Sequence, residues 1–67
     1  MANNKNENLI KARKKKGFTQ GELAKLVNAS SKATISNWEN GYSKPRLEVA
    51  LVLSEVLEVD VFILFGY

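Results

Sequence analysis

The chain has 67 residues, neither cysteine nor histidine, and a formal net charge of +3 at pH 7. This composition excludes disulfides, metal sites built from cysteine or histidine, and catalytic sites that need either residue. The longest apolar runs are five residues each, at 49–53 and 61–65, whereas a membrane-spanning helix needs about 20. The polar first eight residues also lack the pattern of a secretion signal. We therefore expect one small, soluble, cytoplasmic domain.

Charge is distributed unevenly along the sequence. Residues 1–46 hold all ten Lys and Arg together with three acids, a net charge of +7. Residues 47–67 hold four acids and no base, a net charge of −4. This asymmetry favours a polyanionic partner for the first part of the chain, although a solvated basic surface explains the charges equally well.

Helical periodicity recurs along the chain, and no strand alternation is visible over a useful length. The first helix is expected at about 6–16, where Gly17 provides a stop. The second helix is expected at about 19–27. It opens with a capping box, in which Thr19 accepts a hydrogen bond from the backbone N–H of Glu22.

The third helix is expected at about 31–40, with Ser31 as its N-cap and Gly41 as its stop. On a helical wheel its inner side is bulky and consists of Ile35, Trp38 and Glu39. Its outer side is small and polar, carries no acid, and consists of Lys32, Ala33, Ser36, Asn37 and Asn40. We expect Trp38 to lie in the core rather than to stack on a ligand.

The fourth and fifth helices are expected at about 46–57 and 60–65. The fourth has one apolar face that we expect to join the core, formed by Leu47, Ala50, Leu51, Ser54 and Leu57. It has a second apolar face that includes Leu53. With the fifth helix this second face predicts a surface for a dimer or another partner, formed by Val49, Val52, Val56, Phe62 and Ile63. The alternative is that the fifth helix and the N-terminal segment cover that face.

Only about three residues, 28–30, join the second and third helices, so these helices must pack directly against each other. A short helix pair whose second member has a small polar outer face is typical of a helix-turn-helix. Such a second helix fits the major groove of DNA, where its N-terminal residues meet the edges of the bases.

Three motifs follow one another along the chain: Gly17-Phe18-Thr19-Gln20-x-Glu22-Leu23-Ala24, then Thr34-Ile35-Ser36-x-Trp38-Glu39-Asn40-Gly41, then Lys44-Pro45. In this order they resemble the Xre/Cro-type helix-turn-helix family, the lambda-repressor-like DNA-binding domains. The resemblance covers about residues 6–66, and the block from Ile35 to Gly41 is specific. It implies an all-α, five-helix domain that binds operator DNA, usually as a symmetric dimer. It also implies a prokaryotic or phage-encoded protein that joins the nucleoid when bound.

One feature departs from the family pattern. The stretch from Thr19 to Ile35 is one residue longer than usual, and the excess falls within residues 28–31. Asn28 stands where the family often has glycine. This departure predicts either a bulged turn or a different start of the third helix.

The outer face of the third helix supplies the candidate base-reading residues. Lys32 can donate to guanine or to a phosphate, and Asn37 can pair with adenine through two hydrogen bonds. Ala33 can touch a thymine methyl, and Ser36 reaches a base only if the helix lies deep in the groove. The alternative for Lys32 and Asn37 is an ordinary solvated surface side chain.

Phosphate contacts are expected around this face, at Gln20, Ser31, Thr34, Asn40, Lys44 and Arg46. The resemblance implies those of Gln20 and Asn40, whereas Thr34 has the alternative of bonding back to its own helix. Phosphate contacts add affinity and salt dependence without reading the sequence. The resemblance also implies a structural ion pair between Arg13 and Glu39.

The sequence thus predicts a transcriptional regulator that recognises a specific double-stranded DNA sequence. We expect a repressor that binds an inverted-repeat operator as a homodimer, with activation as the nearest rival role. A different class of function is a protein-interaction module, such as an antitoxin that uses the apolar C-terminal face. No catalytic residues, metal site, cofactor or membrane association are expected, because no catalytic pairing, metal cluster or phosphate-cradling loop is recognisable.

Overall fold

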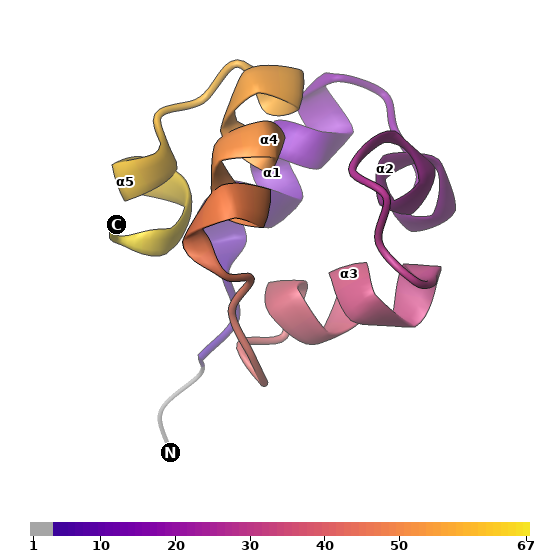
Figure 1. Cartoon of the computed structure of the whole chain (residues 1–67), viewed down its shortest axis with the longest axis horizontal. Helices are drawn as coiled ribbons and strands as arrows, with labels where there is room; N and C mark the ends of the chain where they lie inside the picture. Colours follow the sequence, from indigo (N-terminus) through magenta and orange to yellow (C-terminus); the bar gives the residue numbers. More distant parts are fainter. Residues whose placement is uncertain (1–3) are drawn as a thin grey trace.

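The computed structural model describes residues 4–67 and shows an all-helical fold in them (Figure 1). The five helices are α1 (Glu7–Lys15), α2 (Gln20–Leu26), α3 (Lys32–Glu39), α4 (Leu47–Leu57) and α5 (Val61–Phe65). The predicted fold class is confirmed. All five expected ranges begin one residue before the observed helix, because they count the N-cap residue. The first three also run one residue further at the end, where they count the C-cap residue.

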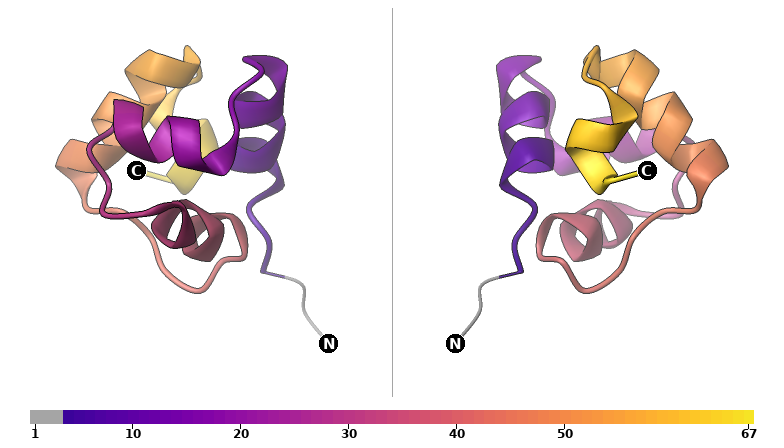
Figure 2. Two further views of the ribbon diagram at one scale, coloured as in Figure 1. Left: turned by 90° about the vertical axis from the view of Figure 1, so that its right-hand side faces the viewer. Right: turned by 90° about the vertical axis from the view of Figure 1, so that its left-hand side faces the viewer.

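The core lies where the five helices meet. Its largest fully buried side chains come one from each helix: Leu9, Leu23, Ile35, Leu53 and Leu64. α3 crosses the lower end of the molecule, beneath the other helices, in both Figure 1 and Figure 2. One long side of α3 is therefore directed away from the core.

The turn between α2 and α3 is closed by Asn28, which adopts the left-handed conformation with φ 58°. The backbone N–H of Ala29 donates to the carbonyl of Ala24 at 2.8 Å, and Ala29 packs against the core. This is a Schellman-type helix end, in which asparagine is the usual substitute for glycine. Ser31 then extends the chain into α3 at Lys32. The longer turn is accommodated without a break in the helix pair.

Gly41 ends α3, and two separate constraints require glycine there. Its φ is 76°, a conformation that a side chain disfavours. A Cβ atom at position 41 would also collide with the backbone carbonyl of Asn4. The N-terminal arm, residues 4–6, therefore runs directly over the C-terminal end of α3.

The expected division of α4 into two faces is wrong. Leu47 and Leu51, expected in the core, are 49% and 47% exposed, whereas Leu53 is fully buried. Val49 and Val56, expected on the outer face, are half-buried and pack against the core. α4 is apolar around most of its circumference, so periodicity alone could not choose its inner side. The structure buries the stripe that meets α5.

Candidate nucleic-acid interface

The outer side of α3 is the candidate DNA-reading face. Lys32, Ala33 and Asn37 are exposed, and Ser36 and Asn40 are half-buried. The inner residues Ile35, Trp38 and Glu39 are all buried. The predicted inner and outer sides of this helix are thus the observed ones, and Trp38 belongs to the core.

A buried carboxylate fixes the position of α3. Glu39 is only 4% exposed, and its Oε2 accepts from Arg13 Nε at 2.5 Å. Its Oε1 accepts from Arg13 Nη2 at 3.3 Å and from Gln20 Nε2 at 2.9 Å. Arg13 Nη1 also donates to the carbonyl of Phe18 at 2.8 Å. The ion pair expected between Arg13 and Glu39 is present, and it joins α3 to α1 and to the start of α2.

Gln20 has a structural role that sequence reasoning missed. It was singled out as a phosphate contact, yet its amide nitrogen is bonded to Glu39 and its side chain is half-buried. An amide carries two N–H groups, so one of them is used here and the other is left for a further acceptor. The sequence did contain a signal for this role. Gln20 is an amide at the first position of α2, and the next helix carries an inward-facing acid, Glu39.

The start of α3 differs in detail from the expectation. Ser31 is the N-cap residue, but its side chain accepts no capping hydrogen bond and remains exposed. The hydroxyl of Thr34 is 3.0 Å from that of Ser30, so it bonds to the turn rather than back to its own helix. Near the end of α3, Asn40 Nδ2 donates to Ser36 Oγ at 3.2 Å.

The loop between α3 and α4 is held by the last residue of the sequence. Tyr67 donates its hydroxyl to the carbonyl of Pro45 at 2.7 Å. The ammonium of Lys44 lies over the Tyr67 ring, 4.6 Å from its centroid. Lys44 and Arg46, both expected to contact phosphates, are exposed on either side of the buried Pro45. Sequence reasoning did not identify Tyr67, because its partners lie more than twenty positions earlier.

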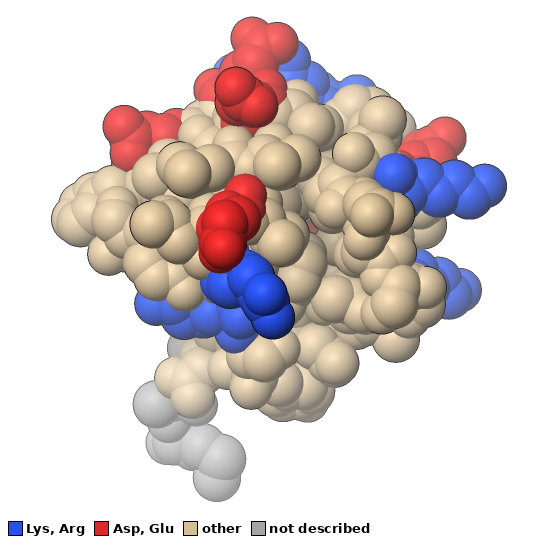
Figure 3. All heavy atoms as spheres, in the orientation of Figure 1, with Lys and Arg blue, Asp and Glu red and all other residues tan. Residues whose placement is uncertain are grey.

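Acidic side chains are absent from one part of the surface. Figure 3 shows acidic atoms over the upper part of this view and at its right-hand edge, with basic atoms among them, and none over its lower end, where α3 lies in Figure 1. Within α3 the only acid is Glu39, which is turned inward. A polyanion can therefore approach the outer side of α3 without meeting an acidic side chain of that helix.

Two other helices, α4 and α5, expose large apolar side chains. Val52, Phe62 and Ile63, expected on a partner surface, are exposed, and Phe62 reaches 66%. Leu47 and Leu51 are exposed as well. We call these five residues the apolar surface. Val49 and Val56 contribute to it only partly, because they pack against the core.

Within residues 4–67, no group of three or more acidic side chains could hold a metal ion. Among the helices of that stretch, none combines the length and the hydropathy that crossing a membrane requires.

Comparison with known families bears directly on these features. A sequence model described as helix-turn-helix matches residues 9–64, which include α2, α3 and the Glu39 network. Comparison with curated proteins and with solved structures gave no match. The match covers most of the chain, and the five-helix arrangement agrees with it. The chain belongs to the Xre/lambda-repressor-like family of helix-turn-helix DNA-binding domains.

Proposed function

We propose that this protein is a transcriptional regulator that recognises a specific double-stranded DNA sequence through the outer side of α3. The observation that carries the proposal is the exposed, small, acid-free face of a helix whose other side is locked to α1 and α2. A rigidly held helix can place hydrogen-bonding groups on base edges with the required accuracy. We further propose that it acts as a repressor, by occupying an operator that overlaps a promoter.

In this account four residues face the bases. Lys32, at the start of α3, donates to guanine or to a phosphate beside it, and Asn37 pairs with adenine. Both side chains are exposed and point away from the core. Ala33 permits close approach and can touch a thymine methyl, whereas the half-buried Ser36 contributes only if the helix lies deep in the groove.

Phosphate contacts surround these residues in the proposed complex. Lys44 and Arg46 supply charge from the loop, and the remaining donors come from Gln20, Ser31, Thr34 and Asn40. Lys44 leaves the face of Tyr67 when it contacts DNA, or it bridges both. These contacts contribute affinity that falls with rising salt, since each phosphate contact releases counterions.

We propose that two copies pair through the apolar surface. Large apolar side chains on neighbouring helices of so small a domain favour burial against a partner. Pairing about a two-fold axis at this end would direct both α3 helices to one side of a duplex. The two half-sites would then lie about 34 Å apart, one turn of DNA.

The same apolar surface favours a second candidate function, a module that binds another protein, as an antitoxin binds a toxin. In that case DNA binding would be secondary or absent. The two candidates differ in what α3 is expected to do, so they are separated by a test of DNA recognition.

The test is selection from a random duplex pool at about 0.15 M salt with excess competitor DNA, conditions that weaken non-specific phosphate binding. We expect enrichment of an inverted repeat whose half-site spacing reports the dimer geometry. Enrichment of a single half-site would support specific DNA recognition and refute the proposed dimer. If no sequence were enriched, the DNA-reading proposal would fail and the protein-binding module would take its place.

A further inference from the structure

Asn6, at the N-terminal end of α1, is bonded to three helices at once. It is the N-cap of α1, where its Oδ1 accepts from the backbone N–H of Leu9 at 3.0 Å. Its own backbone N–H donates to the carbonyl of Glu39, the last residue of α3, at 2.8 Å. Its side-chain Nδ2 donates to the carbonyl of Leu64 in α5 at 2.7 Å. A single half-buried residue thus joins three helices: its side chain bonds to α1 and α5, and its backbone bonds to α3.

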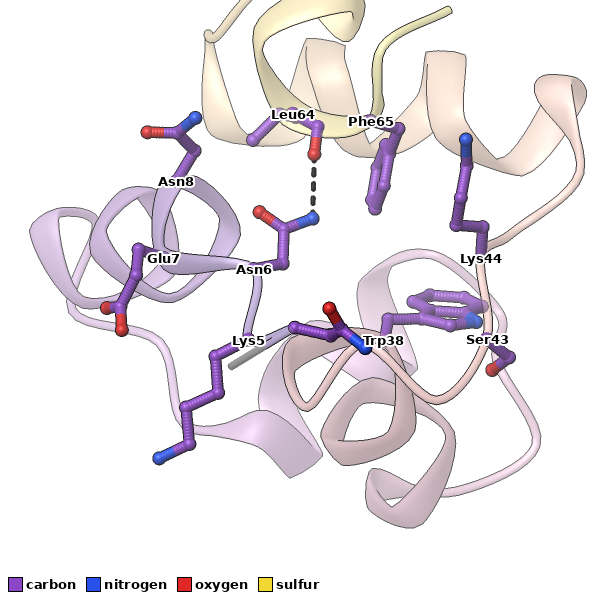
Figure 4. A pocket seen from close by; sticks show the side chains of 11 residues that line it. Lys5, Asn6, Glu7, Asn8, Trp38, Ser43, Lys44, Leu64 and Phe65 are labelled. Carbon is purple, nitrogen blue, oxygen red and sulfur yellow. Dashed lines mark hydrogen bonds between the residues drawn. The ribbon is translucent and has the colours of Figure 1, made fainter. Parts of the chain in front are cut away.

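Figure 4 shows this junction at the wall of a pocket of about 440 Å³, with the Asn6 amide directed toward the Leu64 carbonyl. Trp38 and Phe65 lie beside it in the same pocket. Since Gly41 packs directly beneath the carbonyl of Asn4, the arm cannot shift without disturbing the end of α3. The position of the arm is therefore fixed, and the hydrogen bonds of Asn6 hold it there.

We propose that Asn6 is a positioning residue that couples α5 to the DNA-reading helix. Its side chain holds the arm on α5, and its backbone holds the C-terminal end of α3. α5 carries Phe62 and Ile63 of the apolar surface, so a partner that shifts α5 also acts on α3 through this residue. The effect on DNA affinity rests on the proposed function, whereas the mechanical coupling does not.

Two substitutions isolate the donor to α5. Asp and Ser cap a helix about as well as Asn does, so Asn6→Asp and Asn6→Ser keep the bond from Leu9. Neither supplies the amide N–H that reaches Leu64. Asn6→Ser is neutral, which separates the lost donor from the charge that Asn6→Asp adds.

Asn8→Asp is a matched control. Asn8 also lies on α1 and also donates to a carbonyl of α5, that of Ile63, at 3.1 Å. It makes the same change of charge two residues away, and its hydrogen bond runs to α5. It therefore reports what loss of a bond to α5 does at a residue of α1 whose backbone is not the one bonded to Glu39.

The first readout is amide hydrogen exchange of the protein without DNA. We expect both Asn6 variants to raise exchange about fivefold at Asn40, Gly41 and Tyr42, the amides that close α3, because a lost hydrogen bond of ordinary strength has an effect of that size. The amide of Leu9 should stay protected, since its cap is kept. Asn8→Asp should leave the three α3 amides unchanged. Faster exchange confined to α5, or an equal response to Asn8→Asp, would overturn the coupling.

The second readout is affinity for the duplex enriched in the selection experiment, at a temperature where every variant is folded. We expect both Asn6 variants to bind about threefold to tenfold more weakly than wild type, and Asn8→Asp to lose less than twofold. Unchanged affinity in Asn6→Ser would overturn the effect on DNA binding. If the wild-type protein bound no duplex, the proposed function would fail, while the exchange experiment would still decide the coupling.

Discussion

Two regions of this small domain expose helix faces of opposite character. α3 presents small polar groups, and its inner side is fixed by a buried acid with donors from two other helices. α4 and α5 present large apolar side chains, and no other part of residues 4–67 covers them. α3 is thus held rigidly as a polar surface, whereas α4 and α5 leave apolar area available for burial.

The largest effect is expected at the Glu39 network. Arg13→Ala leaves a buried carboxylate with one remaining donor, Gln20, and should lower the free energy of unfolding by about 3–5 kcal/mol. Urea denaturation measures this loss. Arg13→Lys keeps the charge without the forked geometry and should lie between wild type and Arg13→Ala. The double variant Arg13→Leu/Glu39→Leu should recover much of the loss, and a coupling energy near zero would refute the pair's structural role.

The next effect concerns the apolar surface. Phe62 is largely exposed, so Phe62→Glu should change the unfolding free energy little, by about 0.5 kcal/mol or less. It should weaken self-association at least about tenfold, because it places a charge in a buried apolar contact. Sedimentation equilibrium measures the association. Leu26→Glu, an equivalent change at an exposed leucine of α2, is the control. If both variants self-associated as strongly as the wild-type protein, the proposed dimer surface would be refuted.

A smaller effect is expected at the turn that joins α2 to α3. Asn28 has a positive φ, so Asn28→Ala should cost about 1 kcal/mol, and Asn28→Gly should be neutral or slightly stabilising. Thermal unfolding monitored by circular dichroism distinguishes the two. If alanine were tolerated as well as glycine, the left-handed conformation would not be what closes this turn.

The smallest effect is expected where the basic and acidic parts of the chain meet. Lys16 Nζ lies 2.7 Å from Glu58 Oε2, and this hydrogen bond with the attached charge lowers the pKa of the Glu58 carboxyl. A carboxyl whose pKa is lowered by folding stabilises the fold at pH values above its unfolded pKa. That stabilisation is lost as the pH falls through the lowered folded value.

Both groups are at the surface, so Lys16→Met should lower the Tm only slightly at neutral pH. The difference from wild type should vanish on acidification below the ordinary range of a glutamate, and it should shrink in high salt. A difference that stayed constant from neutral to strongly acidic pH would contradict the pairing.

The sequence was sufficient for features that depend on local pattern. The capping box of Thr19 and Glu22 is present in full, and the wheel of α3 separated its buried side from its exposed side. These features depend on spacings of three or four residues, which periodicity reports directly. The family motifs located the helix-turn-helix for the same reason.

Distant contacts to backbone carbonyls were not predictable from the sequence, and the distant pair of Arg13 and Glu39 was expected only through the family resemblance. The Asn6 amide meets a carbonyl 58 positions away, and Tyr67 meets Pro45 across 22 positions. Backbone carbonyls have no sequence signature, so nothing marked either partner. The buried side of α4 was predicted wrongly for another reason. When a helix is apolar on most sides, the packing of its neighbours decides which side is buried.

DNA recognition by α3 is tested most directly by one comparison of affinities. On the duplex enriched from the random pool, Lys32→Ala/Asn37→Ala should be compared with Lys11→Ala/Asn8→Ala, which removes the same two residue types from α1. We expect the α3 variant to bind at least about 30-fold more weakly, since each of the two base contacts contributes about 1–3 kcal/mol. We expect the α1 variant to lose less than about threefold, through reduced long-range attraction alone. Equal losses in the two variants would contradict recognition by α3 and leave only non-specific attraction between a basic domain and DNA.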